Sequence, residues 1–400
     1  MSSVRAVAMR YLRLWWTPLV LSGVILLTWA VVQSIGGVVL EEDVMRILLW
    51  MMVVLGLQIF SGNSGVMSFG QIAFMGAGAY FAALLTMPQS LKETRFGDMP
   101  EFLASWIQPA ELGLFPAVLA AAALAAILAM IFGVAIARLS GVAATIATLA
   151  ILVIVNTFIV QTPSVTGGSD VVIGVPRETT MGIAALALVV IIFGAYAFKR
   201  SRNGLRLQAS RENEDAAKSV AVNVRKERYI AFVLSALVCG AGGAFYAHFF
   251  TGFAPPDFYF ELTFITIAML VVGGMNSVTG AVVGTYFLTT IYLVARRGEA
   301  DGILGLDPPS GTANLLMAVA LLLALILRPS GITGGKEVPW PGRWRRRVPA
   351  LDAVGPAPAP LDDTEAAVAV RDRARSDDEP ADREPAEAQR SPSGGPARGP

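Results

Sequence analysis

Apolar residues gather along the chain in runs of about twenty, and short polar stretches separate the runs. A run of that length crosses a bilayer as one α-helix. Ten such runs are present, near 16–36, 44–60, 72–87, 113–137, 141–161, 181–198, 229–250, 262–274, 280–295 and 313–328. The third, eighth and ninth are short and adjoin polar segments rich in glycine. The pattern predicts an all-α protein, a polytopic transmembrane helical bundle with about ten spans and helix-breaking Gly/Ser segments.

Composition agrees with a lipid membrane as the surroundings of the chain. Of 400 residues, 54% are hydrophobic and 15% are charged, whereas a soluble protein usually carries about 25% charged residues. The mean hydropathy is +0.60. The net charge of +1 shows no basic or acidic bias, so no nucleic-acid partner is expected.

Lysines and arginines in the short loops predict the orientation, because such residues concentrate in cytoplasmic loops. They are frequent before the first span, in the loop 199–228 and in the cluster 343–347. An even number of spans places all three on one side, so both termini are expected in the cytoplasm. Arg296 and Arg297 fall on the opposite side and are the main exception.

The chain divides by composition into two parts. Residues 1–335 form the predicted transmembrane domain, which includes the loop 199–228. Residues 336–400 are rich in proline, alanine and charged residues and show no apolar periodicity. Such a segment buries too little surface to offset chain entropy, so a disordered cytoplasmic tail is expected.

Three Gly/Ser-rich segments are candidates for the wall of a translocation path. They are 62–71, 166–170 and 273–280. Irregular backbone at membrane depth is tolerated where it is buried in protein or lines a cavity. The candidate path residues in them are Ser64, Gly65, Ser68, Gly70, Gln71, Gly167, Gly168, Asn276 and Ser277. Close helix packing through small residues is the alternative for the first segment, and a plain connecting loop is the alternative for the second.

The loop 199–228 carries a segment, Leu205 to Val222, that predicts one short amphipathic helix. Leu205, Ala209, Ala216, Ala217 and Val220 are available for one side, and charges of both signs occupy the rest. Two interpretations remain open from this pattern. The helix docks in a groove of another protein, or it is a solvated connection.

The interiors of the predicted spans contain no Asp, Glu or Lys. Proton-coupled transporters usually place ionisable groups there. The sequence also shows no His/Cys cluster, no phosphate-binding loop and no nucleophile motif. We therefore expect no catalytic residue, no metal and no cofactor, and we expect any energy source to reside on another chain.

Several motifs in the breaks and the loop follow one another along the chain. The first break has Gly62, Gly65, Ser68 and Gly70, followed by Gly78-Ala79-Tyr80. Next come Thr148-Leu149-Ala150, Thr166-Gly167-Gly168 and Gly174-Val175-Pro176, and the loop 199–228 has Gly204, Arg206, Arg211-Glu212-Asn213-Glu214, Ala216-Ala217, Ser219 and Asn223. The last break has Gly273, Gly274, Ser277 and Gly280, and the final span is followed by Arg328-Pro329-Ser330-Gly331. In this order the motifs resemble those of the permease subunits of branched-chain amino-acid ABC importers, and the loop 199–228 is called the coupling loop below. Ala221 and Val171 stand where this family usually has glycine.

The resemblance implies a transport subunit and not an enzyme, located in the bacterial inner membrane. It implies a heterodimer with a second homologous permease, two ATP-binding subunits docked from the cytoplasm and an external solute-binding protein. The residues implied in ATPase coupling are Arg206, Arg211, Glu212, Asn213, Ala216 and Ala217, and Thr148 joins the candidate path residues. Branched-chain amino acids lead as the solute, followed by urea or short amides. A stand-alone secondary transporter, and a membrane enzyme or scaffold, are the alternatives from other classes.

Overall fold

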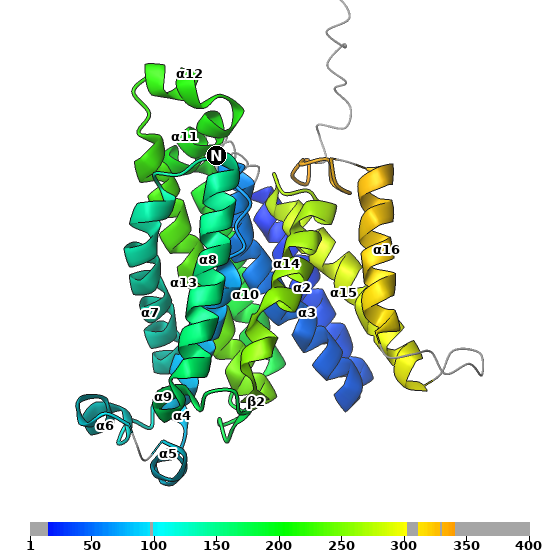
Figure 1. Cartoon of the computed structure of the whole chain (residues 1–400). Helices are drawn as coiled ribbons and strands as arrows, with labels where there is room; N and C mark the ends of the chain where they lie inside the picture. The colour runs from blue at the N-terminus through cyan, green and yellow to red at the C-terminus, as the bar shows by residue number, and fades with distance from the viewer. Residues whose placement is uncertain (1–14, 97–98, 302–310, 329, 341–400) are drawn as a thin grey trace, which may run out of the picture. The chain divides into compact units, whose positions relative to one another are not determined.

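The structure is a computed structural model that describes residues 15–96, 99–301, 311–328 and 330–340. Helices make up nearly all of it (Figure 1). Its helices of seven residues or more are α2 Trp16–Ile35, α3 Val38–Leu57, α4 Gln71–Thr86, α5 Gln89–Arg95, α6 Glu101–Ile107, α7 Leu114–Ile136, α8 Gly141–Gln161, α10 Met181–Arg200, α11 Arg202–Glu212, α13 Val224–Phe250, α14 Phe260–Gly273, α15 Val278–Asp301 and α16 Thr312–Leu327. The predicted all-α membrane fold is confirmed.

Short elements connect or extend these helices. The π-helical turn η1, Gln58–Gly62, continues α3, and the 3-10 turn η2, Pro255–Phe258, precedes α14. Two further short helices are α9 Pro163–Thr166 and α12 Glu214–Ser219. The strands β1 Val172–Ile173 and β2 Gly252–Phe253 pair antiparallel, with Val172 opposite Phe253.

Each of the ten predicted spans coincides with a helix, but they are not equally long. Eight helices in the described part of the chain are long and apolar enough to cross a membrane. The α4 helix qualifies only together with α5, and the two meet at a bend of 117°. With 16 residues each, α4 and α16 reach only about 24 Å at a rise of about 1.5 Å per residue, so each is short for a span of its own.

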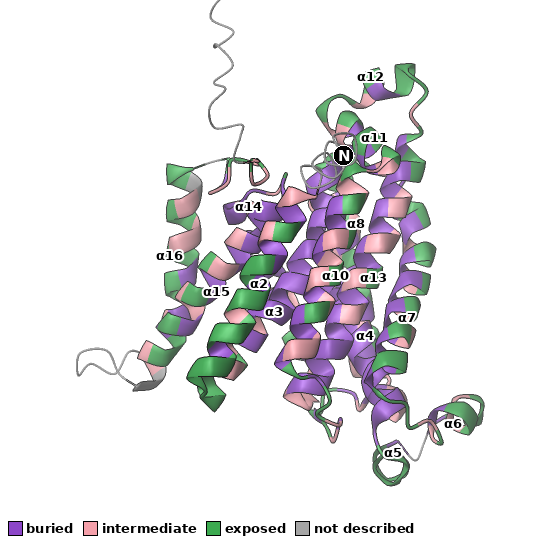
Figure 2. Cartoon of the chain, turned by 180° about the vertical axis from the view of Figure 1, so that it is seen from behind, coloured by how far each residue is buried: buried purple, intermediate pink, exposed green. Residues whose placement is uncertain are grey.

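The α13 helix lies at the centre of the bundle, where it packs against α4, α7 and α3. The close approach to α4 requires glycine, because a β-carbon on Gly243 would collide with the backbone oxygen of Met75. The span formed by α3 and η1 is 94% buried, whereas the span of α2 is only 28% buried. Figure 2 shows this difference, with α3 mostly buried and much of α2 exposed.

The coupling loop and the segment 330–340 lie at the same end of the bundle (Figure 1). The α5 and α6 helices and β2 lie at the other end. Contacts between distant parts of the chain support this arrangement: the ring of Trp16 packs against that of Trp340 at 4.9 Å, and Lys199 bonds Glu337. The sequence predicts that the chain's start, the loop 199–228 and the basic cluster 343–347 lie on one side of the membrane. Residues 1–14 and 343–347 lie outside the described residues.

Residues 336–340, assigned by composition to the tail, pack onto the helices. Val338 accepts a hydrogen bond from Thr17 at 3.3 Å, and Glu337 contacts α15. These residues therefore pack with the helices, although the composition assigns them to the segment after 335. The rest of the predicted tail, 341–400, lies outside the described residues.

Candidate functional site

The coupling loop folds as two helices and not as the single helix predicted over Leu205 to Val222. The α11 helix ends at Glu212, and Asn213 adopts an extended conformation with φ −154° and ψ 110°. Its side-chain oxygen accepts a hydrogen bond from the backbone N–H of Ala216 at 2.9 Å, which caps the start of α12. The backbone therefore turns at residue 213 because a cap formed there competes with a continuous helix.

Charged contacts fix α12 on the start of α13. The guanidinium of Arg228 lies 2.7 Å from the carboxylate of Glu214, and the Arg228 side chain is only 8% exposed. Burial opposes ionisation of Glu214. Hydrogen bonds and charge from Lys218 and Arg228 outweigh it and hold the pKa of that carboxyl below its ordinary value. The short helix is therefore held by a charged contact as well as by its own cap.

The residues predicted for ATPase coupling separate into two groups. Arg211, Asn213 and Ala217 have structural contacts within the chain. Ala217 is buried, Asn213 caps α12, and Arg211 donates a hydrogen bond to the helical bundle. Arg206, Glu212 and Ala216 are exposed. The Arg206 guanidinium also lies 3.5 Å from the buried carboxylate of Glu227 on α13.

The apolar side predicted for the loop is mostly exposed in this chain. Only Ala217 of its five members is buried, whereas Leu205 is 57% and Val220 is 72% exposed. The buried positions are instead Gly204, Leu207 and Ser210. Because α11 ends at Glu212 and α12 starts at Glu214, the five residues do not lie on one helix. Leu205 and Val220 are left exposed on a polar loop, and the exposed residues Leu205, Arg206, Glu212, Ala216 and Val220 are together called the coupling face below.

Arg211 connects the loop to two of the predicted helix breaks. Its guanidinium donates hydrogen bonds to the backbone oxygen of Gly62, at 3.1 Å, and to the side-chain oxygen of Asn276, at 2.6 Å. Gly62 ends η1, and Asn276 lies between α14 and α15. Gly65, with φ +73°, lies against the Arg211 side chain, which occupies the position of a β-carbon there. The structure therefore brings the first and third breaks together under the loop.

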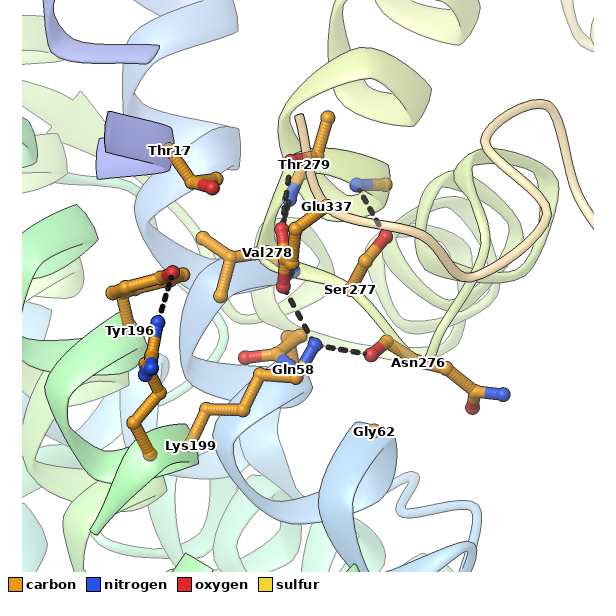
Figure 3. A network of polar contacts seen from close by, with 12 residues as sticks. Thr17, Gln58, Gly62, Tyr196, Lys199, Asn276, Ser277, Val278, Thr279 and Glu337 are labelled. Carbon is orange, nitrogen blue, oxygen red and sulfur yellow. Dashed lines mark hydrogen bonds and ion pairs between the residues drawn. The ribbon is translucent and has the colours of Figure 1, made fainter. Parts of the chain in front are cut away.

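A second polar cluster closes the break between α14 and α15 (Figure 3). The carboxylate of Glu337 accepts hydrogen bonds from the backbone N–H groups of Val278 and Thr279, at 2.9 and 3.0 Å, and from the Thr279 hydroxyl at 2.7 Å. It therefore caps the N-terminus of α15, where a negative charge is favoured. Lys199, at the end of α10, lies 2.6 Å from the same carboxylate and donates to the backbone oxygen of Asn276.

These contacts determine the ionisation of Glu337. Burial raises the cost of its charge, but the ammonium of Lys199 and the hydrogen bonds from Thr279 outweigh burial and hold the pKa of the carboxyl below its ordinary value. The charged form is therefore part of the folded structure. Ser277 joins the same region, because its hydroxyl lies 3.1 Å from that of Thr333.

Apart from Gly65, which is exposed, the candidate path residues of the first break are buried among helices. Ser64, Ser68, Gln71 and Thr148 are at most 3% exposed. The Ser68 hydroxyl donates to Gln71 at 3.0 Å, and Gln71 donates to Ser235 on α13 at 2.8 Å.

Thr148 of α8 extends this packing to a further helix. Its hydroxyl accepts from the backbone N–H of Phe69 at 3.1 Å, and Gly70 lies against its backbone oxygen. These contacts join the first break and α4 to α8 and α13, and they favour the packing interpretation of the first break. A role in the path stays a prediction for these residues.

The glycine pair Gly167 and Gly168 lies elsewhere, in the turn that follows α9. Both residues have positive φ, 81° and 66°, a backbone conformation that glycine adopts readily. The Thr166 hydroxyl accepts from the Gly168 N–H at 3.3 Å and donates to the backbone oxygen of Ile159. These contacts are those of a structured turn, and the structure does not place the pair with the other candidate residues.

Sequence reasoning missed Lys199, Glu337 and Gln58 as members of this site. Gln58, in η1, is fully buried, and its side-chain amide has no hydrogen-bond partner within the described part of the chain. Its polarity inside an apolar run was the available signal. Glu337 gave no such signal, because it lies in a segment of tail-like composition.

Comparison with known protein families gives a match over the same regions of the chain. Residues 41–328 match the family described as the permease component of branched-chain amino acid transport systems. The chain belongs to this family. This confirms the resemblance found in the sequence, and the matched region covers the α3–α16 helices that carry the breaks and the coupling loop.

Individual members of the family and its neighbours are distant in sequence. The high-affinity branched-chain amino acid transport system permease protein LivM of Escherichia coli is 23% identical over 343 residues, which cover 77% of this chain and 72% of that protein. The probable branched-chain amino acid transport permease protein LivH of Methanocaldococcus jannaschii is 26% identical over 160 residues, 38% of this chain and about half, 47%, of that protein. The nucleoside ABC transporter permease protein NupC of Lactococcus lactis is 30% identical over 142 residues, 36% of this chain and 44% of that protein. No solved structure matches the chain.

Proposed function

We propose that the protein is the membrane-spanning permease subunit of an ATP-binding-cassette importer that moves branched-chain amino acids across the bacterial cytoplasmic membrane. ATP is hydrolysed on two partner subunits, and an external binding protein delivers the solute. A second, homologous permease completes the path. Family membership and the match to LivM along most of the chain support this assignment.

The observation that carries the proposal is the mechanical connection through Arg211. The coupling face is exposed at one end of the bundle, where Leu205 and Val220 have apolar surface to bury against a partner. Arg211 joins the same helix to Gly62 and Asn276. A displacement of the loop by an ATPase is therefore passed to η1, at the end of the α3 span, and to the break before α15.

The second permease is expected on the apolar surfaces that the described part of this chain leaves uncovered. Leu27 and Ile35 on α2 are 65% and 67% exposed, and Ile326 and Leu327 on α16 are 67% and 75% exposed. Lipid covers the remainder of such surface. Alternating access between the two permeases is the expected transport mechanism.

The decisive test reconstitutes the full assembly in liposomes and measures leucine uptake together with leucine-stimulated ATP hydrolysis. Replacing Glu212 by Ala and Val220 by Ser in one variant removes two contacts of the coupling face, and we expect reduced co-purification of the ATPase and loss of stimulated hydrolysis. Asp215→Ala is the matched control, because Asp215 is 95% exposed on the same loop and contacts only Lys218 in the described structure. Unchanged ATPase binding and coupling in the double variant would contradict the docking assignment.

A nucleoside is the competing solute, because NupC, a relative with 30% identity over 142 residues, bears a nucleoside transporter's name. The same liposomes distinguish the two solutes. Uptake of leucine, isoleucine and valine without uptake of uridine supports the amino-acid importer. Uptake of uridine alone would overturn the solute and leave the permease assignment intact, whereas leucine uptake by the chain alone without ATP would indicate a secondary transporter.

A further inference from the structure

A cavity of about 280 Å³ lies at the end of the bundle opposite the coupling loop. It is formed where the start of α3, the end of α13, η2 with the start of α14, and the end of α15 meet. Arg46 and Arg296 contribute to its lining from α3 and α15. The other end of α3, at Gly62, contacts Arg211 of the coupling loop. The predicted orientation therefore places this cavity on the outer side of the membrane.

Charges of both signs line the cavity. The positive groups are those of Arg46 and Arg296, and the negative groups are those of Asp257 and Glu261. The guanidinium of Arg46 lies over the rings of Phe250 and Trp50, 4.8 and 5.8 Å from their centroids, which positions its charge through cation–π contacts. One carboxylate oxygen of Asp257 accepts from the N–H of Ala254 at 2.8 Å, which fixes that side chain on η2.

Apolar surface completes the lining. Leu262 and Ile265 belong to α14, one turn apart, and both are 6% exposed. The rings of Trp50 and Tyr292 pack at 5.7 Å and form a wall. Small-molecule sites measure about 300–1,000 Å³, and this cavity lies just below that range with a mainly polar lining, so it suits a small polar solute.

Arg296 and Arg297 are the exceptions to the predicted concentration of positive residues on the cytoplasmic side. The structure separates the two. Arg297 forms an ion pair with Asp43, whereas Arg296 lines the cavity. Arg296 is thus a positive side chain on the predicted outer side, where such residues are less frequent, and it shares the cavity with carboxylates and aromatic rings.

We propose that this cavity is an entry site for a small zwitterion with an aliphatic side chain, an α-amino acid. The carboxylate of the solute meets the guanidinium groups of Arg46 and Arg296, its ammonium group meets Asp257, and its side chain lies against Leu262 and Ile265. Bidentate recognition of a carboxylate is a property of arginine. The site holds solute released at the outer mouth before the path opens. This inference rests on the proposed import of amino acids.

Equilibrium binding to the full-length permease in nanodiscs, without the binding protein, tests the site. The probes are leucine, leucine amide, which lacks the carboxylate, 4-methylpentanoate, which lacks the ammonium group, and uridine. We expect leucine to bind at least tenfold more tightly than either analogue. Arg46→Gln and Asp257→Asn should each weaken leucine at least tenfold. Arg46→Gln should change leucine amide little, because that probe has no carboxylate to lose.

Arg297→Gln is the matched control, because it removes a neighbouring arginine outside the cavity lining, and it should leave leucine binding within about twofold. Thermal unfolding of each variant establishes that the fold is retained, and a variant that fails to fold is replaced by Arg296→Gln. Leucine binding that is absent, or equal in the wild type and in folded Arg46→Gln and Asp257→Asn variants, overturns the site. Uridine binding of equal strength also overturns it.

Uptake by the reconstituted assembly separates this inference from the importer proposal. Leucine uptake that is unchanged in the cavity variants preserves the importer and rejects the entry site. Leucine binding that depends on Arg46 and Asp257, in an assembly that takes up no amino acid, supports the site and rejects the importer. Loss of both leucine binding and uptake in the variants, with Arg297→Gln unaffected, supports both.

Discussion

The ammonium group of Lys199 lies 2.6 Å from the carboxylate of Glu337, although 138 residues separate them along the chain. The side chains are 13% and 21% exposed, so water screens the pair little. Lys199 ends α10 just before the coupling loop, and Glu337 caps α15. The segment 330–340 therefore connects the base of the coupling loop to the helix break at 274–277.

Replacing Glu337 by Gln should destabilise this end of the bundle. The change removes the negative charge that pairs with Lys199 and stabilises the N-terminus of α15. It leaves the mostly buried ammonium group of Lys199 with the backbone oxygen of Asn276 as its other partner. We expect the free energy of unfolding to fall by about 2 kcal/mol. Thermal unfolding in detergent micelles, followed by circular dichroism, measures it. Glu42→Gln, the same chemical change at an exposed position of α3, should have an effect of less than about 0.5 kcal/mol.

The stabilisation by Glu337 should depend on pH. Its folded-state pKa lies below the ordinary value, so folding favours the charged form. The stabilisation is complete above the unfolded-state pKa, about 4.3, and is lost as the pH falls through the lower folded-state pKa. The stability difference between wild type and Glu337→Gln should therefore be constant from pH 7 to about pH 5.5 and shrink below that range. A difference that grows in acid would contradict the ionised pair.

The helices at the ten predicted spans could be predicted from the sequence because each depends on a local property, an apolar run, although only eight of them are long enough to cross a membrane in the described part of the chain. The α3 and α13 helices show this, since both lie where their runs predict them. The break at Asn213 depends on one capping bond that competes with a continuous helix. Asn followed by Glu and Asp is a common start of a helix, so that break could have been found.

The position of Glu337 could not be predicted in the same way. Its partners, Lys199 and Thr279, are brought to it by the packing of α10 and α15, and nothing in the composition of 330–340 indicates them. Gln71 shows a different limit. A polar residue in a glycine-rich break can line a path or bond a neighbouring helix, and the sequence alone does not distinguish the two. Its hydrogen bond to Ser235 appears only in three dimensions.

Arg211→Ala should uncouple the ATPase from the helix breaks without releasing the loop. The variant loses the charged hydrogen bonds to Gly62 and Asn276, each worth about 1.5–3 kcal/mol, whereas the cap at Asn213 and the pair between Arg228 and Glu214 remain. We expect leucine-stimulated ATP hydrolysis to fall about tenfold or more, since about 1.4 kcal/mol corresponds to tenfold, and ATPase co-purification to persist. Arg225→Ala, at an exposed position in the same loop, is the control. Full stimulation in the Arg211 variant would show that coupling takes another route.

Two glycine substitutions of the same kind should have different effects on stability. A β-carbon on Gly243 of α13 would collide with the backbone oxygen of Met75 on α4, and backbone atoms in two packed helices cannot move independently. We expect Gly243→Ala to lower the free energy of unfolding by about 3 kcal/mol or more, through separation of α13 from α4. Gly194 on α10 has no atom within 4 Å of the equivalent position, so Gly194→Ala should be neutral or stabilising by up to about 1 kcal/mol, the helix propensity gained. Thermal unfolding of both variants in the same detergent makes the comparison, and equal effects would contradict the close α4–α13 contact at the centre of the bundle.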